Sequence, residues 1–265
     1  MMKFFLAIVM IAMLAQAEEV APFLHAQYEK SDAVEKKLQD NGFTIVAKYS
    51  ALPQSTTIVF SDEALQKEGA KKQRAFIAVM KVFVDDKEKQ VSVTNPLYYG
   101  PAFMQKDYDK NVFQNEAKKL TKTFGKLTPS KDTLDADDLV DYHFMMGMPY
   151  YEDQIEVATG DNAELLQKVQ SYEGGKRVLF AMKLPSGSVL VGYDLSDKVE
   201  RFPQKIGRAN AGLLPWTIKI EGGEATILHP KYYIALSYPK LSMGQFMTIS
   251  SVPGEIEDDI EAAFK

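Results

Sequence analysis

Polar and apolar residues along the chain form two similar series, and each series begins with a helical pattern followed by a β-type run. Ser31 opens the first helical pattern, and the alternating segment 43–49 follows it. Asp161 opens the second, which is followed by the segment 178–184. Serine and aspartate are preferred N-cap residues, so we expect a helix to begin at each of these two positions.

Two pairs of alternating segments predict β-hairpins at matching places in the two series. They are residues 75–84 with 90–94 and residues 216–220 with 225–228. The second pair is joined by Gly222-Gly223, which suits the positive φ angles of a tight hairpin turn. Leading strands are expected at residues 23–28 and 154–159.

The clearest internal repeat is a Pro-x-Tyr-Tyr segment, which follows the second strand of each predicted hairpin. It begins at Pro96 in the first series and at Pro230 in the second, an offset of 134 residues. The offset between Ser31 and Asp161 is 130 residues, so order and spacing persist along both series. We therefore predict that the chain contains an internal duplication.

The two series define the predicted domain organisation. Each reads β-α-β-β-α-β-β-α, which is typical of an α+β fold with helices over one sheet face. We predict two tandem two-layer α/β sandwich domains with mainly antiparallel or mixed sheets. The domains are expected at residues 18–126 and 150–265, with residues 127–149 as the linker.

The amino-terminal segment has the pattern of a cleavable secretory signal peptide. Lys3 precedes an apolar run at residues 4–14, and Ala15-Gln16-Ala17 supplies small residues for cleavage. The run is shorter than the roughly 20 apolar residues that span a bilayer. We expect residues 1–17 to be removed and the mature chain, without a transmembrane segment, to be periplasmic or secreted.

The composition narrows the range of functions. The 265 residues carry a net charge of −5 and contain no dense basic stripe, which argues against nucleic-acid binding. The chain has no cysteine, which excludes disulfides, thiolate metal sites, iron–sulfur clusters and cysteine nucleophiles. No sequence feature predicts a cofactor.

One segment of the second series resembles a known family. Residues 212–220 read Gly-Leu-Leu-Pro-Trp-Thr-Ile-Lys-Ile, and a glycine pair and His229-Pro230 follow. This pattern resembles the bacterial and archaeal domain of unknown function numbered 302, which carries a cysteine where this chain has Trp216 and an aspartate where it has His229. The first series matches only in its alternating strand and Asn95-Pro96. The resemblance implies a compact α+β fold and carries no established activity.

Aromatic residues around the two Pro-x-Tyr-Tyr segments form one candidate ligand site. Side chains with an aromatic body and a polar tip are common in ligand pockets and interfaces. The same tyrosines would also serve to seat a helix on a sheet. The candidate ligand-binding residues are Tyr98, Tyr99, Trp216, His229, Tyr232 and Tyr233.

A His/Met segment in the linker is the candidate metal site. His143 is followed by Met145, Met146 and Met148, and imidazole and thioether groups are ligands that suit copper. Methionine is also a common gap-filler between packed domains, and no repeated Met-x-x-Met array accompanies the segment. We expect these methionines to be buried by packing, with copper binding as the alternative.

The linker also contains aspartates that could bind calcium through hard oxygen ligands. They are Asp132, Asp135, Asp137, Asp138 and Asp141. The spacing and glycine of an EF-hand are missing, whereas aspartate is favoured at helix starts. A solvated helix start is therefore the expectation for this segment.

No catalytic template is recognisable in the sequence. His25, His143 and His229 lie in no H-E-x-x-H array, and no nucleophile elbow or P-loop is present. We expect a non-enzymatic binding or interaction module for a small molecule or a partner protein. An enzyme that uses His229 in a cleft between the repeats is the alternative, and copper handling is a third. A titratable group within hydrogen-bond reach of His229 would favour the enzyme.

Overall fold

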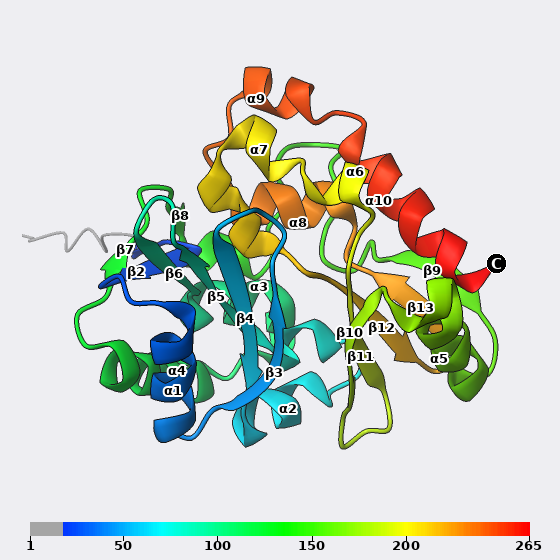
Figure 1. Cartoon of the computed structure of the whole chain (residues 1–265), viewed down its shortest axis with the longest axis horizontal. Coiled ribbons are helices and arrows are strands. Elements are labelled where there is room, and N and C mark those ends of the chain that lie inside the picture. The colour runs from blue at the N-terminus through cyan, green and yellow to red at the C-terminus, as the bar shows by residue number, and fades with distance from the viewer. Residues whose placement is uncertain (1–17) are drawn as a thin grey trace, which may run out of the picture.

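The computed structural model describes residues 18–265, so the predicted signal peptide lies outside the described residues. Alternating segments of the first series pair into a six-stranded sheet (Figure 1). Its strands are β2 (Phe23–Ala26), β3 (Thr44–Tyr49), β4 (Ser55–Ser61), β5 (Met80–Asp85), β6 (Gln90–Thr94) and β7 (Thr128–Pro129).

The second series forms a five-stranded sheet, and two short segments near the linker form a separate ribbon. The strands of the second sheet are β9 (Ile155–Thr159), β10 (Val178–Lys183), β11 (Val189–Tyr193), β12 (Trp216–Glu221) and β13 (Glu224–Ile227), and the ribbon pairs β1 (Glu19–Val20) with β8 (Leu134–Asp135). All of the strand pairs in residues 18–265 are antiparallel.

Helices connect and cover the strands, which confirms the predicted α+β class. The α-helices are α1 (Ser31–Asp40), α2 (Glu63–Gly69), α3 (Pro96–Met104), α4 (Lys110–Phe124), α5 (Asn162–Ser171), α6 (Asp197–Glu200), α7 (Pro203–Ile206), α8 (Pro230–Ser237), α9 (Met243–Thr248) and α10 (Val252–Glu261). Helix α1 packs on β3 and β4, and α5 packs on β12 and β13. None of the helices in the described residues is long and apolar enough to cross a membrane.

Local sequence signals explain several of these boundaries. The side chain of Asp161 accepts hydrogen bonds from two backbone amides and caps α5, as expected. Gly222 and Gly223 both have positive φ and turn the β12–β13 hairpin. The prediction that Ser31 caps α1 is wrong, because Ser31 is already helical and Lys30 occupies the N-cap without a side-chain bond.

The two sheets share one strand order. In the first sheet the order is β3-β4-β5-β6-β2, with β7 added at the edge, and in the second it is β10-β11-β12-β13-β9. Each of the first five strands in this order thus has a counterpart with the same neighbours in the second sheet. We call residues 18–126 the first half and residues 150–265 the second half. Their common origin, and their division into two domains, stay predictions.

Each half contributes one short 3-10 helix that packs on the sheet of the other half. η1 (Ala75–Ala78) leads into β5 of the first half but packs on β11 and β12 of the second. η5 (Arg208–Leu213) leads into β12 of the second half but packs on β5 and β6 of the first. The prediction of one strand over 75–84 is therefore wrong at its start. Those four apolar residues are buried between α2 and α3 of their own half and β11 and β12 of the other half.

Helices α3 and α8, which carry the Pro-x-Tyr-Tyr segments, form reciprocal contacts. The hydroxyl of Tyr98 donates to the carbonyl of Leu236 at 2.6 Å, and that of Tyr232 donates to the carbonyl of Ala102 at 3.1 Å. Tyr98 and Tyr232 are 134 residues apart, and so are Ala102 and Leu236. The halves thus meet as the two subunits of an isologous dimer do, within a single chain.

The apolar core is continuous through both halves and the linker. Leu139 of the linker is fully buried, and the hydroxyl of Tyr142 donates to the carbonyl of Ala235 in α8. Strand β7, also from the linker, pairs with β2. The linker is therefore part of the packed structure.

Candidate functional site

The tyrosines and the tryptophan of the candidate ligand site lie in the interior, where α3 and α8 meet. Tyr98, Tyr99, Tyr232, Tyr233 and Trp216 are all buried. The rings of Trp216 and Tyr233 pack edge-to-face, and Tyr99 donates a hydrogen bond to Ser237. These side chains pack at the contact between the halves, and the hydroxyls of Tyr98, Tyr99 and Tyr232 form hydrogen bonds inside the protein.

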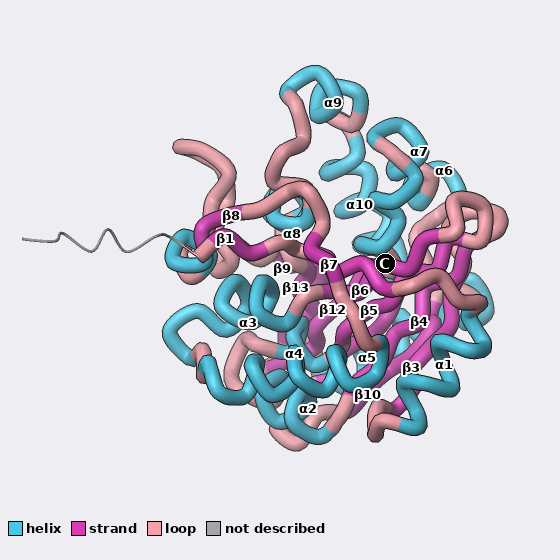
Figure 2. Tube along the Cα trace, turned by 90° about the vertical axis from the view of Figure 1, so that its left-hand side faces the viewer, coloured by secondary structure: helices cyan, strands magenta, loops and turns pink. Residues whose placement is uncertain are grey.

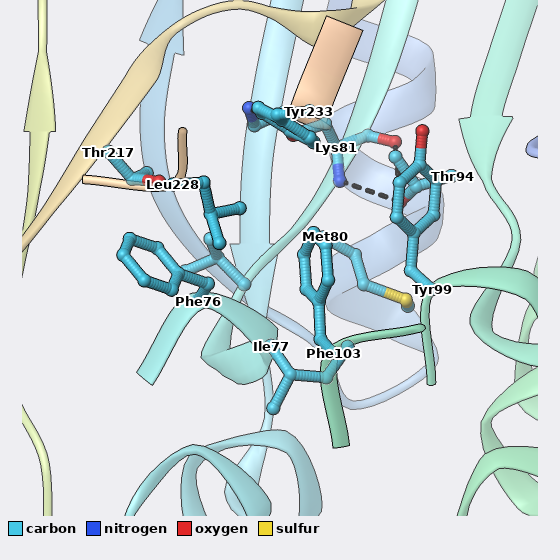
Figure 3. A pocket seen from close by; sticks show the side chains of 11 residues that line it. Phe76, Ile77, Met80, Lys81, Thr94, Tyr99, Phe103, Thr217, Leu228 and Tyr233 are labelled. Atoms are coloured by element: carbon cyan, nitrogen blue, oxygen red, sulfur yellow. Dashed lines mark hydrogen bonds between the residues drawn. The ribbon is translucent and has the colours of Figure 1, made fainter. Parts of the chain in front are cut away.

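A small cavity lies beside this aromatic contact (Figure 3). Phe76, Phe103, Thr217 and Tyr233 are among the side chains that line it, together with Lys81. Its volume is about 20 Å³, which is enough for a single water molecule. The cavity is too small for a metabolite, so it is not a ligand pocket.

Lys81 is the most unusual group at this cavity. Its side chain is buried, and its Nζ donates to the carbonyl oxygens of Leu213 and Pro215, the second at 2.7 Å. The hydroxyl of Tyr233 lies 3.4 Å from the same Nζ. No carboxylate within the described residues forms an ion pair with it, and burial lowers its pKa to about 7.

Two further polar clusters contain carboxyl groups whose pKa is raised. Burial and the neighbouring carboxylate of Asp62 raise the pKa of Glu116 to about 7. At the contact between the halves, burial raises the pKa of both Asp194 and Glu200, and Tyr49 donates a 2.7 Å hydrogen bond to Glu200. The hydroxyl of Tyr49 is itself buried and committed to this bond, which raises its pKa.

His229 lies apart from the buried aromatic residues and lines an open groove of about 450 Å³. The groove runs between the linker and the start of α8, and we call it the His229 groove. Its polar and sulfur-bearing side chains come from Met148, Tyr150, Asp153, His229 and Lys231. His229 thus lies in an accessible groove, apart from the buried Tyr98, Tyr99 and Trp216, and its role in ligand binding stays a prediction.

The imidazole of His229 has a structural role on one side. Its Nδ1 accepts a 3.2 Å hydrogen bond from the backbone amide of Lys231 and thereby caps α8. Burial, assisted by the charge of Lys231, lowers the pKa of His229, so the neutral ring is favoured at pH 7. Within the described residues, no titratable side chain lies within hydrogen-bond reach of this ring. The contacts of this ring therefore add no support for an enzyme centred on His229, which stays a prediction.

His143 reaches the edge of the same groove. Its ring packs on the ring of Tyr150, with centroids 4.4 Å apart. Tyr150, Met148 and His229 all line the groove, so the structure places His143 beside the groove that contains His229.

The expectation that the linker methionines are buried is wrong for two of them. Met146 is 95% exposed and Met145 is 44% exposed. The physical reason is the turn at this point, where the amide of Met148 donates to the carbonyl of Met145 and Gly147 has a positive φ. The turn projects both side chains outward, while Leu139 and Tyr142 supply the buried contacts of the linker.

The exposed methionines belong to a larger surface. Within residues 18–265, the exposed large apolar side chains are Met145, Met146, Tyr150, Met243 and Met247. We call this set the methionine patch. Its two segments are joined by the rings of Phe144 and Phe246, which stack at 6.4 Å with an interplanar angle of 9°. The patch is continuous with the His229 groove, because Tyr150 belongs to both.

Sequence reasoning missed Met243 and Met247. They lie on α9, which stands at the outer edge of the molecule (Figures 1 and 2). The signal was a Met-x-x-x-Met spacing, which places two side chains on one helix face. This spacing indicates a binding surface only if α9 is exposed and contacts the linker about 100 residues earlier in the sequence. The local pattern reveals neither the exposure nor the contact.

Three of the five linker aspartates, Asp135, Asp137 and Asp138, lie at the start of a helix. Asp135 caps the 3-10 helix η3 (Ala136–Leu139) by accepting from the amide of Asp137 at 3.0 Å. In the described part of the chain, no group of three or more His, Asp or Glu side chains is arranged to hold a metal ion.

Comparisons with known proteins do not identify the chain: no model of a protein family, no curated protein and no solved structure matches it. The resemblance to the domain of unknown function numbered 302 therefore rests on the residues around Trp216 and His229 and stays a prediction.

Proposed function

We propose that the chain is an exported, non-catalytic binding module whose binding face consists of the methionine patch and the His229 groove. Export is inferred from the Ala15-Gln16-Ala17 pattern behind the apolar run. The binding face is made by the linker, the start of α8 and α9, so it lies where the two halves are joined.

The observation that carries this proposal is the clustering of exposed apolar side chains. Single exposed apolar residues are normal, but a contiguous apolar surface with a polar border commonly marks an interaction site. Here the large exposed apolar side chains of the described residues come from two segments that the Phe144–Phe246 stack holds together. Methionine suits such a surface, because its flexible, polarizable side chain adapts to different ligands.

The surroundings of His229 favour binding over catalysis. A general base needs a partner that orients it or a proton that it can reach, and His229 uses Nδ1 to cap a helix. Lys81 and Glu116, whose pKa values burial shifts to about 7, do not line this groove. The groove can therefore contribute an imidazole and an ammonium to a bound ligand, from His229 and Lys231.

Native mass spectrometry of the protein purified from the cells that make it tests the proposal. We expect the wild type to retain a non-covalent species that is lost from a Met146→Gln/Met243→Gln/Met247→Gln variant. These changes remove apolar surface at exposed positions, so the variant should fold normally. Lys36→Gln on α1, which is also exposed, is the control and should retain the species. A wild type without any retained species, or equal retention by all three proteins, would contradict the proposal.

A further inference from the structure

Two thioethers project side by side from α9. Met243 and Met247 are four residues apart and are 58% and 62% exposed. Residues at this spacing lie on the same helix face, with Cβ atoms about 5–6 Å apart. Ser242 and Gln245 form a capping box that fixes the start of this short helix. The pair is therefore held in place by local structure, although neither side chain is buried.

The linker adds two more exposed thioethers next to this pair. Phe246 lies between Met243 and Met247 in the sequence, and its ring stacks on Phe144. Phe144 is followed directly by Met145 and Met146, in the turn closed by the bond from the Met148 amide. The four exposed methionine side chains thus come from two segments that share one aromatic contact.

The chemistry of these groups selects a particular kind of ligand. A thioether is neutral and soft, so it binds Cu(I) and other soft cations and has little affinity for calcium, magnesium or manganese. The chain contains 12 methionines and no cysteine, so thioethers are its sole sulfur ligands. Neutral ligands suit a monovalent cation, whose charge needs no carboxylate for compensation.

We infer that the methionine patch binds Cu(I) through the sulfurs of Met243 and Met247 together with a sulfur from the linker turn, Met145 or Met146. This inference rests on the proposed function, because it names the ligand of the same binding face. The imidazole of His143 lies at the border of the patch, on the ring of Tyr150.

An apolar docking surface is the competing explanation of the patch. Replacing methionine by leucine distinguishes apolar docking from Cu(I) binding. Leucine has nearly the volume and hydrophobicity of methionine but no sulfur, so Met→Leu keeps the apolar surface and removes the ligand. The test variants are Met243→Leu/Met247→Leu and Met146→Leu. Met182→Leu in β10 is the matched control, because it removes a thioether outside the patch.

The measurement is anaerobic competition for Cu(I) between the mature protein and a chromogenic Cu(I) chelator. We expect the wild type and Met182→Leu to remove one equivalent of Cu(I). Met243→Leu/Met247→Leu should bind at least about tenfold more weakly, since losing even an outer-shell partner of a metal costs 10–100-fold in affinity. Failure of the wild type to compete, or equal affinity in the patch variants and the control, would overturn the inference.

Mapping of methionine oxidation identifies the ligands independently. Exposed methionines are converted to sulfoxides by peroxide, and coordination to Ag(I), a redox-inert substitute for Cu(I), blocks the sulfur lone pair. We expect Ag(I) to protect Met243 and Met247 in peptide mass spectra and to leave Met182 unchanged. Equal oxidation of Met243 and Met247 with and without Ag(I) would exclude them as ligands.

The outcomes separate this inference from the proposed function. If the species retained from cells persists in the leucine variants and disappears in the glutamine variant, the patch binds by apolar contact and the Cu(I) inference fails alone. If Cu(I) binds tightly and the leucine variants lose it, the Cu(I) inference stands. The proposed function stands with it when the wild type also retains a species from cells, and fails alone when it retains none.

Discussion

The two halves use the same strand order but differ at the contact that joins them. Aligning the hairpins through Pro96 and Pro230 places Asp85 and Glu221 at equivalent positions, and likewise Lys81 and Thr217. In a homodimer such pairs would be identical, because one gene encodes both sides. Here each side can change alone. The contacts of Tyr98 and Tyr232 are reciprocal, while the charged and polar positions differ between the halves.

The largest expected difference concerns Asp85 and Glu221. Asp85 is buried and pairs with Nε of Arg208 at 2.7 Å, whereas Glu221 is partly exposed and accepts from the backbone amide of Gln73. Asp85→Ala should destabilise the protein by on the order of 3 kcal/mol, because it leaves a guanidinium without its partner. Glu221→Ala should cost about 1 kcal/mol or less. Urea unfolding of both variants measures the difference, and equal losses would show that burial does not distinguish the two positions.

Lys81 gives the next largest effect, as a dependence of stability on pH. Its pKa in the folded protein, about 7, is below the ordinary value of 10.5. Between these pH values the unfolded chain binds a proton that the folded chain lacks, so stability rises with pH. At 1.36 kcal/mol per pH unit, the gain from pH 7.5 to 9.5 should be about 2 kcal/mol.

Lys81→Met should remove this gain, since methionine fills the site without titrating. Thr217→Val, at the equivalent position of the second half, should leave the pH dependence unchanged. Denaturant unfolding at several pH values between 7.5 and 9.5 gives the comparison. If Lys81→Met keeps the slope of the wild type, the titration of Lys81 is not its source.

The tyrosine contacts should give smaller and equal effects. Tyr98→Phe and Tyr232→Phe each remove one hydroxyl that donates across the halves, to the carbonyls of Leu236 and Ala102. A lost hydrogen bond of this kind costs about 1 kcal/mol. Urea unfolding of the two variants should therefore show equal losses. A large loss in one variant and none in the other would mean that the contact is reciprocal in geometry but not in energy.

The elements of the fold were predictable because their signals are local. Alternation marked the strands around Gly222-Gly223, and Asp161 marked the start of α5. The segment 75–78 was misread, since an apolar run looks the same in a strand as in a 3-10 helix buried against another part of the chain. Its partner strands, β11 and β12, lie more than 100 residues further on.

The candidate site was predictable only in part, for a similar reason. His229 and the linker methionines were recognised as polar or soft groups, but their exposure depends on the linker turn and on the groove beside it, which the folded chain forms. Lys81 gave no signal, because lysine is rarely buried and its neighbours Leu213 and Pro215 come from the other half. Met243 and Met247 became notable once α9 was seen to lie against the linker.

The smallest expected effect lies in the linker, which has no counterpart in either half. Burial of Met146 would have made its truncation cost about 2 kcal/mol. Its side chain is 95% exposed, so Met146→Ala should change the free energy of unfolding by less than about 0.5 kcal/mol. Met104→Ala is the matched comparison, because Met104 is fully buried at the end of α3 and should cost about 2–5 kcal/mol.

Thermal or urea unfolding of these two variants, without added metal, distinguishes a surface methionine from a packed one. If Met146→Ala lowered the free energy of unfolding by about 2 kcal/mol, the linker turn would be packed in solution, because burial of an apolar side chain stabilises by about this amount. With no loss, a stretch that joins the two halves presents a large apolar side chain to solvent without stabilising the fold. Such a residue is then free to serve binding alone, because its replacement leaves the contact between the halves intact.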